Sequence, residues 1–118
     1  MTRKVSIPFP GTPVRGSKSG APIMALLDLL GRRWALGVVW TLAENGPLPF
    51  KALQDQCESI SPGILNTRLK ELRAAGLVTA ADGLYALTPQ GRQLFEFMRP
   101  MGVWARNRWA KALRDRED

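Results

Sequence analysis

Three polar side chains, Asn66, Thr67 and Lys70, carry the clearest chemistry in this sequence. Asn can bond an adenine edge, Thr offers a hydroxyl and a methyl group to thymine, and Lys can reach guanine or a phosphate. In a helix over residues 61–75 they would share a face with Gly63 and Arg73, opposite a stripe of three leucines. The stripe consists of Leu65, Leu69 and Leu72. This face suits the major groove of DNA, although any amphipathic helix presents a polar face to solvent.

Two further residues, Ser61 and Arg68, flank this polar face. Ser61 precedes Pro62, and a hydroxyl residue before proline is a typical helix N-cap, so we expect Ser61 close to the groove as well. Arg68 falls at the edge of the leucine stripe. It either contacts a phosphate or pairs with a nearby carboxylate, Glu71 or Glu44.

The flanking residues predict the elements that would hold this helix. The stretch "LPFKALQDQC" predicts a short helix, and a short helix, a turn and a second amphipathic helix form a helix-turn-helix. Two apolar runs around Asp82-Gly83 predict a hairpin over residues 77–87, a small wing. The expected fold is mainly α with a small β-hairpin, a winged helix-turn-helix of about five to six helices.

The N-terminal third divides into an arm and two apolar helices. Residues 1–20 have four basic residues and no acid, which predicts a flexible basic arm, either a solvated tail or a segment that tracks DNA. Residues 22–30 predict a short apolar helix that ends at Gly31, and residues 34–43 predict the central buried helix. The winged domain is expected over residues 21–118.

Residues 88–118 predict the closing helices. Thr88 and Pro89 begin them, and Pro100 lacks an N–H, so we expect two segments rather than one rod. Their apolar residues recur near the helical period and exceed what a chain-end helix needs for its own fold. Alternatively, Trp104 and Trp109 cover the core of the monomer.

Composition favours a polyanionic partner and argues against an enzyme. Seventeen Lys and Arg against ten Asp and Glu give a net charge of +7, which suits nucleic acid or an anionic membrane surface. With no histidine and a single cysteine, Cys57, we expect no catalytic residue, metal site or cofactor. The longest uncharged stretch in the middle of the chain is too short to span a bilayer, and no secretory signal is evident, so a cytoplasmic protein is expected.

Four blocks of the sequence together resemble a known family. They are "LLGRRWALGVVWTL", "PFKAL", "ISPGILNTRLKELRAAGLV" and "YALTPQGRQL". From Pro22 to Trp104 the chain resembles the HxlR-type transcriptional regulators, winged helix-turn-helix proteins related to the MarR group. The resemblance implies a sequence-specific regulator, expected to be a repressor, that binds double-stranded DNA.

The resemblance also implies a homodimer formed by the first and last helices, which sets two recognition helices into successive major grooves of a pseudo-palindromic operator. The interface residues that we expect are Ile23, Leu26, Leu27, Phe95, Met98, Met101, Trp104 and Trp109.

The chain departs from the family pattern in four places. Ala21 replaces a cysteine that some members use to sense oxidants, and Cys57 does not match that position. Pro49 replaces an arginine, the wing is short with Asp82-Gly83 at its tip, and Gly63 replaces a larger polar residue. These changes predict a weaker or differently placed DNA complex, which the basic arm could compensate.

Two alternatives of other classes stay open. The first is a winged helix retained for protein-protein contact after DNA affinity was lost. The second is a sensor for an unknown small-molecule effector, with a pocket near the dimer seam lined by Trp34, Trp40, Trp104 or the methionines. The same residues would serve equally well as packing.

Overall fold

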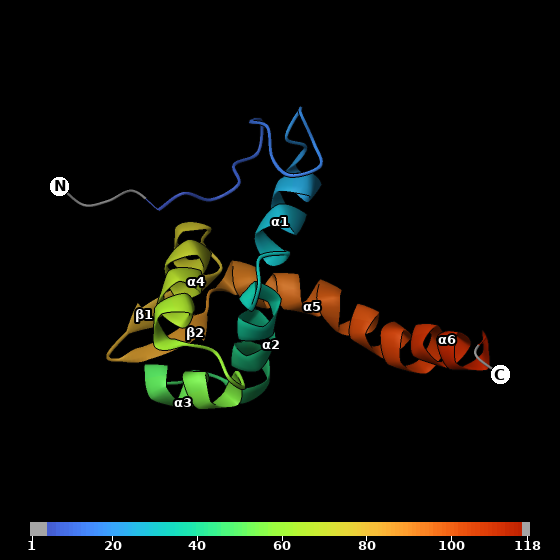
Figure 1. The fold of residues 1–118 in the computed structure, drawn as a ribbon. Coiled ribbons are helices and arrows are strands. Elements are labelled where there is room, and N and C mark those ends of the chain that lie inside the picture. The colour runs from blue at the N-terminus through green and yellow to red at the C-terminus, as the bar shows by residue number, and fades with distance from the viewer. Residues whose placement is uncertain (1–4, 117–118) are drawn as a thin grey trace.

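The computed structural model describes residues 5–116. It is mainly helical with one two-stranded antiparallel hairpin, as predicted, and one long helical run extends away from the body (Figure 1). In chain order the elements are α1 (Pro22–Leu30), α2 (Ala35–Asn45), α3 (Phe50–Gln56), α4 (Pro62–Ala74), β1 (Val78–Ala81), β2 (Leu84–Leu87), α5 (Pro89–Trp104), a π-helical turn (Ala105–Trp109) and α6 (Ala110–Arg116).

The core forms around α2, which contacts α3, α4, β2 and α5. This confirms the central buried helix. Its apolar side chains pack against the leucine stripe of α4, so the hydrophobic effect holds the two helices together. The largest fully buried side chains are Val38, Val39, Leu42, Leu53, Leu65, Leu69 and Leu72.

The helix-turn-helix consists of α3 and α4. The Oγ of Ser61 accepts a hydrogen bond from the N–H of Ile64 at 3.2 Å, so Ser61 caps α4 as predicted. Pro62 occupies the first turn, and Gly76 follows α4 with a φ of +77°, a conformation that glycine adopts without steric cost.

The wing is a hairpin in register from Val78 opposite Leu87 to Ala81 opposite Leu84. Its two turn residues, Asp82 and Gly83, have φ values of +53° and +78°, as a tight two-residue turn requires. The sheet also has a contact that the sequence did not reveal. Leu48 and Tyr85 exchange two main-chain hydrogen bonds of 2.9 and 2.8 Å, so the segment before α3 joins the wing.

The start of α5 is fixed against the end of α4. The hydroxyl of Thr88 accepts from the N–H of Gly91 at 3.0 Å and donates to the carbonyl of Gly76 at 2.6 Å. Gly91 is buried against Leu77, the residue before β1, and a Cβ there would lie 2.1 Å from the carbonyl oxygen of Leu77. Glycine is therefore required for this close approach.

The closing segment corrects one expectation. Pro100 lies inside α5, which continues to Trp104 and passes through the π-helical turn into α6 without a break (Figure 1). Proline removes one hydrogen bond of the helix but does not end it here. The irregular turn begins five residues later, at Ala105.

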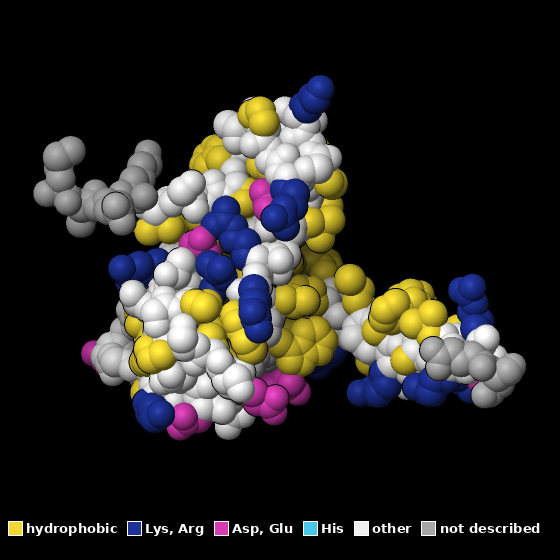
Figure 2. Space-filling view, in the orientation of Figure 1, with side chains coloured by type: hydrophobic (Ala, Val, Ile, Leu, Met, Phe, Trp, Pro, Cys, Tyr) yellow, Lys and Arg dark blue, Asp and Glu magenta, His cyan; other side chains and the backbone are white. Residues whose placement is uncertain are grey.

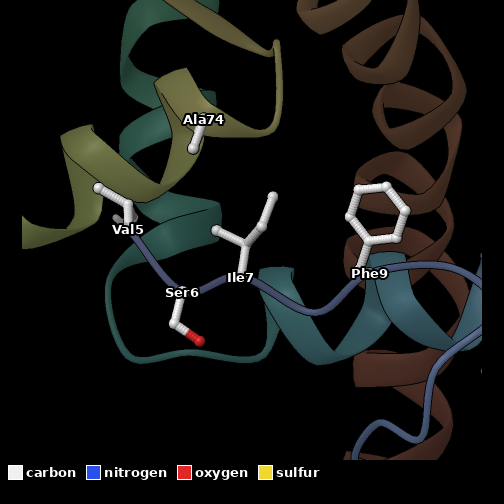
Figure 3. Close-up of a pocket in the computed structure, with 5 residues that line it drawn as sticks. All are labelled: Val5, Ser6, Ile7, Phe9 and Ala74. Carbon is white, nitrogen blue, oxygen red and sulfur yellow. The ribbon is translucent and has the colours of Figure 1, made fainter. Parts of the chain in front are cut away.

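The N-terminal segment also differs from the predicted solvated arm. Ile7 packs against the core, whereas residues 9–19 form a mostly exposed loop that is closed by a hydrogen bond from the N–H of Gly11 to the carbonyl of Gly20 at 2.9 Å. Val5, Ser6 and Ile7 pass the C-terminal end of α4, Phe9 lies farther along beside α1, and together with Ala74 these residues line a cavity of about 570 Å³ (Figure 3). Residues 1–4 lie outside the described part of the chain.

Candidate nucleic-acid interface

The polar face of α4 is exposed, as the position of its leucine stripe predicts. Asn66, Thr67, Lys70 and Arg73 are exposed on the side opposite the buried leucines, and Ser61 and Gly63 are exposed at the start of the helix. These side chains are therefore accessible to a macromolecule that approaches α4.

The hydrogen-bonding capacity of this face is largely unused. Among residues 5–116, neither a side-chain hydrogen bond nor an ion pair engages Asn66, Lys70 or Arg73. The hydroxyl of Thr67 donates to the carbonyl of Gly63 at 3.0 Å, which leaves its oxygen free to accept and its methyl group exposed. The face offers an amide, a hydroxyl and two cations to a partner.

Arg68 differs from its neighbours because its guanidinium is directed into the protein. Its Nη1 lies 2.8 Å from Oε1 of Glu71, and its Nε donates to the carbonyl of Arg33 at 2.7 Å. The structure thus selects the ion pair with Glu71 over a pair with Glu44. Two of its three guanidinium nitrogens are thus engaged within the protein, and we expect Arg68 to hold α4 in place rather than to contact a phosphate.

Glu71 is buried and accepts from two arginines, Arg68 and Arg32. Arg32, in the loop between α1 and α2, also donates to the carbonyl of Ser6 at 3.2 Å. We call Arg32, Arg68 and Glu71 the Glu71 ion cluster. Sequence analysis missed Arg32, although an acidic residue beside a leucine stripe indicates a buried partner. The cluster fixes α4 relative to the α1–α2 loop and the N-terminal segment.

The wing brings no positive charge to the interface. Residues 77–87 contain no Lys or Arg, and Asp82 is exposed at the tip. In α3, Lys51 pairs with Asp55 at 3.1 Å, and Pro49 is the N-cap residue. Because phosphates repel carboxylates, the positive potential must come from α4 and other elements.

A stripe of exposed apolar side chains runs along α5 and α6. In Figure 2, hydrophobic side chains gather on one edge of the extended helical run, and Lys and Arg gather on the opposite edge and at the far end. We call these residues the terminal apolar stripe: Phe97, Met101, Trp104, Trp109 and Leu113. A solvated helix rarely exposes so much apolar surface, and such a stripe is typical of an interaction surface.

The π-helical turn keeps this stripe on one face. Trp104 and Trp109 are five residues apart, the spacing at which a π-helix closes its hydrogen bonds. In an uninterrupted α-helix, five residues would turn Trp109 roughly 140° away from Trp104. Sequence analysis missed Phe97, which shares the helical period of Met101 and Trp104 within α5, and Leu113, which lies beyond the turn where the period shifts.

The expected interface residues fall into two groups. Phe95 and Met98 are 5% and 7% exposed and belong to the core of the monomer, so their assignment to an interface was wrong. Ile23, Leu27, Met101, Trp104 and Trp109 are all more than half exposed, and Leu26 is partly buried. Trp104 and Trp109 therefore do not cover the core of the monomer.

Cys57 is buried at the end of α3, and its Sγ lies 3.8 Å from the hydroxyl oxygen of Thr41. Burial raises the pKa of the Cys57 thiol above its usual value, against a smaller opposing effect of the hydrogen bond with Thr41. The thiol is consequently less reactive than an exposed one.

Comparison with known proteins decides the family. Residues 29–113 match the HxlR-like helix-turn-helix family, a range that runs from the end of α1 through the wing into α6. The chain belongs to this family.

Individual relatives of the chain are likewise helix-turn-helix transcriptional regulators. The chain is 31% identical over 90 residues to an HTH-type transcriptional regulator, BH0655, of Halalkalibacterium halodurans, covering 70% of this chain and 80% of the relative. It is 33% identical over 85 residues to the HTH-type transcriptional regulator YodB of Bacillus subtilis, covering 66% of this chain and 75% of YodB.

Solved structures of HxlR-type proteins share the fold. The quinone-bound form of B. subtilis YodB superposes with a TM-score of 0.67 at 32% identity, covering 71% of this chain and 94% of that one. A possible HxlR family transcriptional factor from Thermoplasma volcanium gives a TM-score of 0.59 at 28% identity, over 73% of this chain and 86% of that one.

The HxlR family and these relatives are transcriptional regulators rather than enzymes. The protein is a DNA-binding transcriptional regulator of the helix-turn-helix type. Along residues 5–116, each helix is too short or too polar to cross a lipid bilayer.

Proposed function

We propose that this HxlR-type protein is a homodimeric repressor that inserts α4 of each subunit into the major groove of a pseudo-palindromic operator. The observation that carries the proposal is the exposed face of α4, on which Asn66, Lys70 and Arg73 keep their hydrogen-bonding groups free while the opposite face is buried.

The dimensions and charge of α4 support major-groove insertion. Its 13 residues make a rod of about 20 Å, and the major groove is wide enough to admit a helix. Asn66 and Thr67 carry base-reading groups, whereas Lys70 and Arg73 supply cations for bases or phosphates. The Glu71 ion cluster and the buried leucines hold this face in one orientation, which reduces the entropy lost on binding.

The terminal apolar stripe supports the homodimer. A second copy of the stripe, together with Ile23 and Leu27 of α1, would cover side chains that are otherwise exposed to water. Two-fold symmetry would then present two α4 helices to one operator, and the half-sites would be about one helical turn, 10–10.5 base pairs, apart.

Selection of bound duplexes from a random pool tests this function directly. The expected product is a pair of inverted half-sites separated by about one helical turn or a multiple of it. Enrichment of a single half-site would overturn the dimeric mode. Enrichment of no sequence at all, with binding that does not weaken as salt rises, would instead favour the protein-protein interaction module.

A repressor role requires a separate measurement. With the selected operator placed over a promoter, transcription in a purified system should fall as the protein is added. An increase in transcription would identify an activator.

A further inference from the structure

A cleft of about 490 Å³ between α2 and α5 combines aromatic surface with positive charge. Trp40 and Phe95 line it, with ring centroids 5.0 Å apart and planes at 77°, an edge-to-face pair. Gly102 of α5 lies against this pair, and a Cβ there would be 2.7 Å from the Trp40 ring. The indole of Trp40 can pack this close to α5 because Gly102 has no side chain.

Two arginines and one glutamate complete the lining of the cleft. Arg99 and Arg106 are seven residues apart, two turns along the same side of the closing helices. The Arg99 guanidinium lies 5.2 Å from the centre of the Phe95 ring and 3.2 Å from Glu96 Oε1. Within residues 5–116, Arg106 has no acidic partner, and Glu44 has no basic one.

The cleft lies on a different face from the terminal apolar stripe. On an α-helix, Arg99 is roughly 140–200° around the axis from Phe97, Met101 and Trp104. A homodimer joined through the stripe would therefore leave the cleft open. The cleft contacts both the central helix of the domain and the helix that carries the stripe, so an occupant would touch both.

We infer that this cleft binds a small aromatic monocarboxylate. The planar ring of the ligand would lie on Trp40, with the buried Phe95 packed edge-to-face behind the indole, and its carboxylate would accept hydrogen bonds from Arg99 and Arg106, whose forked donors match that group. Glu44 would repel a second negative charge, so the ligand should carry only one carboxylate. Of the tryptophans that the sequence suggested for a ligand pocket, Trp40 lines this cleft, whereas Trp104 is exposed on the opposite face.

Titration of the full chain with 2-naphthoate tests the site. The indole N–H signal of Trp40 in an NMR spectrum, assigned with Trp40→Phe, should shift saturably. The neutral amide of the same ring system, 2-naphthamide, should bind at least about fivefold more weakly, because charge-assisted hydrogen bonds are the stronger ones. Arg106→Gln should weaken naphthoate binding about tenfold, and Arg99→Gln should weaken it as well.

A matched control separates the cleft from the general positive charge. Arg114→Gln removes one exposed cation from the same helical run, outside the cleft, and should leave naphthoate affinity unchanged. The inference is overturned if naphthoate causes no saturable shift at Trp40, if the amide binds as tightly as the acid, or if Arg114→Gln and Arg106→Gln weaken binding equally. None of these readouts depends on DNA binding, so they are independent of the proposed function.

Discussion

The Nε of Arg68 in α4 donates to the main-chain carbonyl of Arg33 at 2.7 Å, across 35 residues of sequence. The same side chain pairs with Glu71, which also binds Arg32 of the α1–α2 loop. From this relationship we expect Arg68 to orient the DNA-facing helix rather than to touch DNA. It also leads to the first prediction.

Glu71→Gln should destabilise the protein by about 2 to 3 kcal/mol, since it leaves two partly buried guanidinium groups without a counter-charge. Urea unfolding followed by circular dichroism, at fixed protein concentration, measures the change. The control is Asp55→Asn, which breaks the exposed pair with Lys51 and should cost less than about 0.5 kcal/mol. Equal losses for the two variants would contradict the structural role of the Glu71 ion cluster.

Arg73→Ala should weaken binding to all duplexes alike and lower the slope of log affinity against log salt by about one, because it removes one phosphate contact. Fluorescence anisotropy with labelled duplexes at several salt concentrations gives the slope. Lys111→Ala, which removes an exposed cation in α6, is the matched control and should leave the slope unchanged. A slope that falls equally in both variants would disprove the placement of Arg73.

Asn66→Ala should lower affinity for the selected operator by about 1–3 kcal/mol and leave affinity for unrelated duplexes unchanged, because it removes a contact to a base edge. The same anisotropy assay with matched and mismatched duplexes measures both. If affinity falls equally for every duplex, Asn66 does not read bases.

Trp104→Glu should convert the dimer to a monomer, since a charge at the middle of the terminal apolar stripe cannot be buried without a partner. We expect the dimer dissociation constant to rise at least about 100-fold, measured by sedimentation equilibrium. Leu84→Glu places the same charge at an exposed apolar position on the wing and should leave the dimer intact. Wild-type protein that sediments as a monomer would refute the interface altogether.

Two glycine substitutions should have opposite effects on stability. Gly91→Ala introduces a Cβ that would lie 2.1 Å from the backbone of Leu77, so we expect a loss of about 3 kcal/mol or more. Gly63→Ala meets nothing within 4 Å and should gain up to about 1 kcal/mol from helix propensity. Thermal unfolding should show a clear fall in Tm for the first variant only, and unchanged Tm values for both would invalidate the packing at Gly91.

Cys57 should react slowly with Ellman's reagent in the folded protein. Because burial raises its pKa, the thiolate fraction near pH 7 is smaller in the native chain than in the unfolded one, and the native rate should rise only at higher pH. We expect the rate in urea to exceed the native rate at least about tenfold. Diamide should leave operator binding intact, and a loss of binding that Cys57→Ala prevents would reveal a redox role.

The sequence predicted most of the fold because its local signals agreed with one another. Ser61 and Pro62 marked the start of α4, Asp82-Gly83 marked the wing turn, and Thr88 marked the start of α5. Each is a local effect of capping or turn geometry, which depends on residues close in the chain. The exposed face of α4 followed from the period of its leucines alone.

What the sequence did not predict depends on contacts between distant residues. Three such contacts join segments that are far apart in the sequence and that no local pattern connects. They are the hydrogen bond from Arg68 to Arg33, the pairing of Leu48 with Tyr85 and the packing of Ile7 against the core. The burial of Phe95 likewise depends on Trp40, in a different helix. The expected break of the helix at Pro100 was wrong, because the effect of a proline depends on how firmly the flanking helical turns are packed.

The shared carboxylate of Glu71 has a consequence for signal transmission. Because Glu71 belongs to α4 and binds Arg32 of the loop that follows α1, a tilt of α1 would be passed to α4 through this ion pair. In the proposed homodimer, a small rotation between the subunits would thus alter the distance between the two α4 helices, and operator affinity would respond to the subunit angle with neither helix needing to unfold.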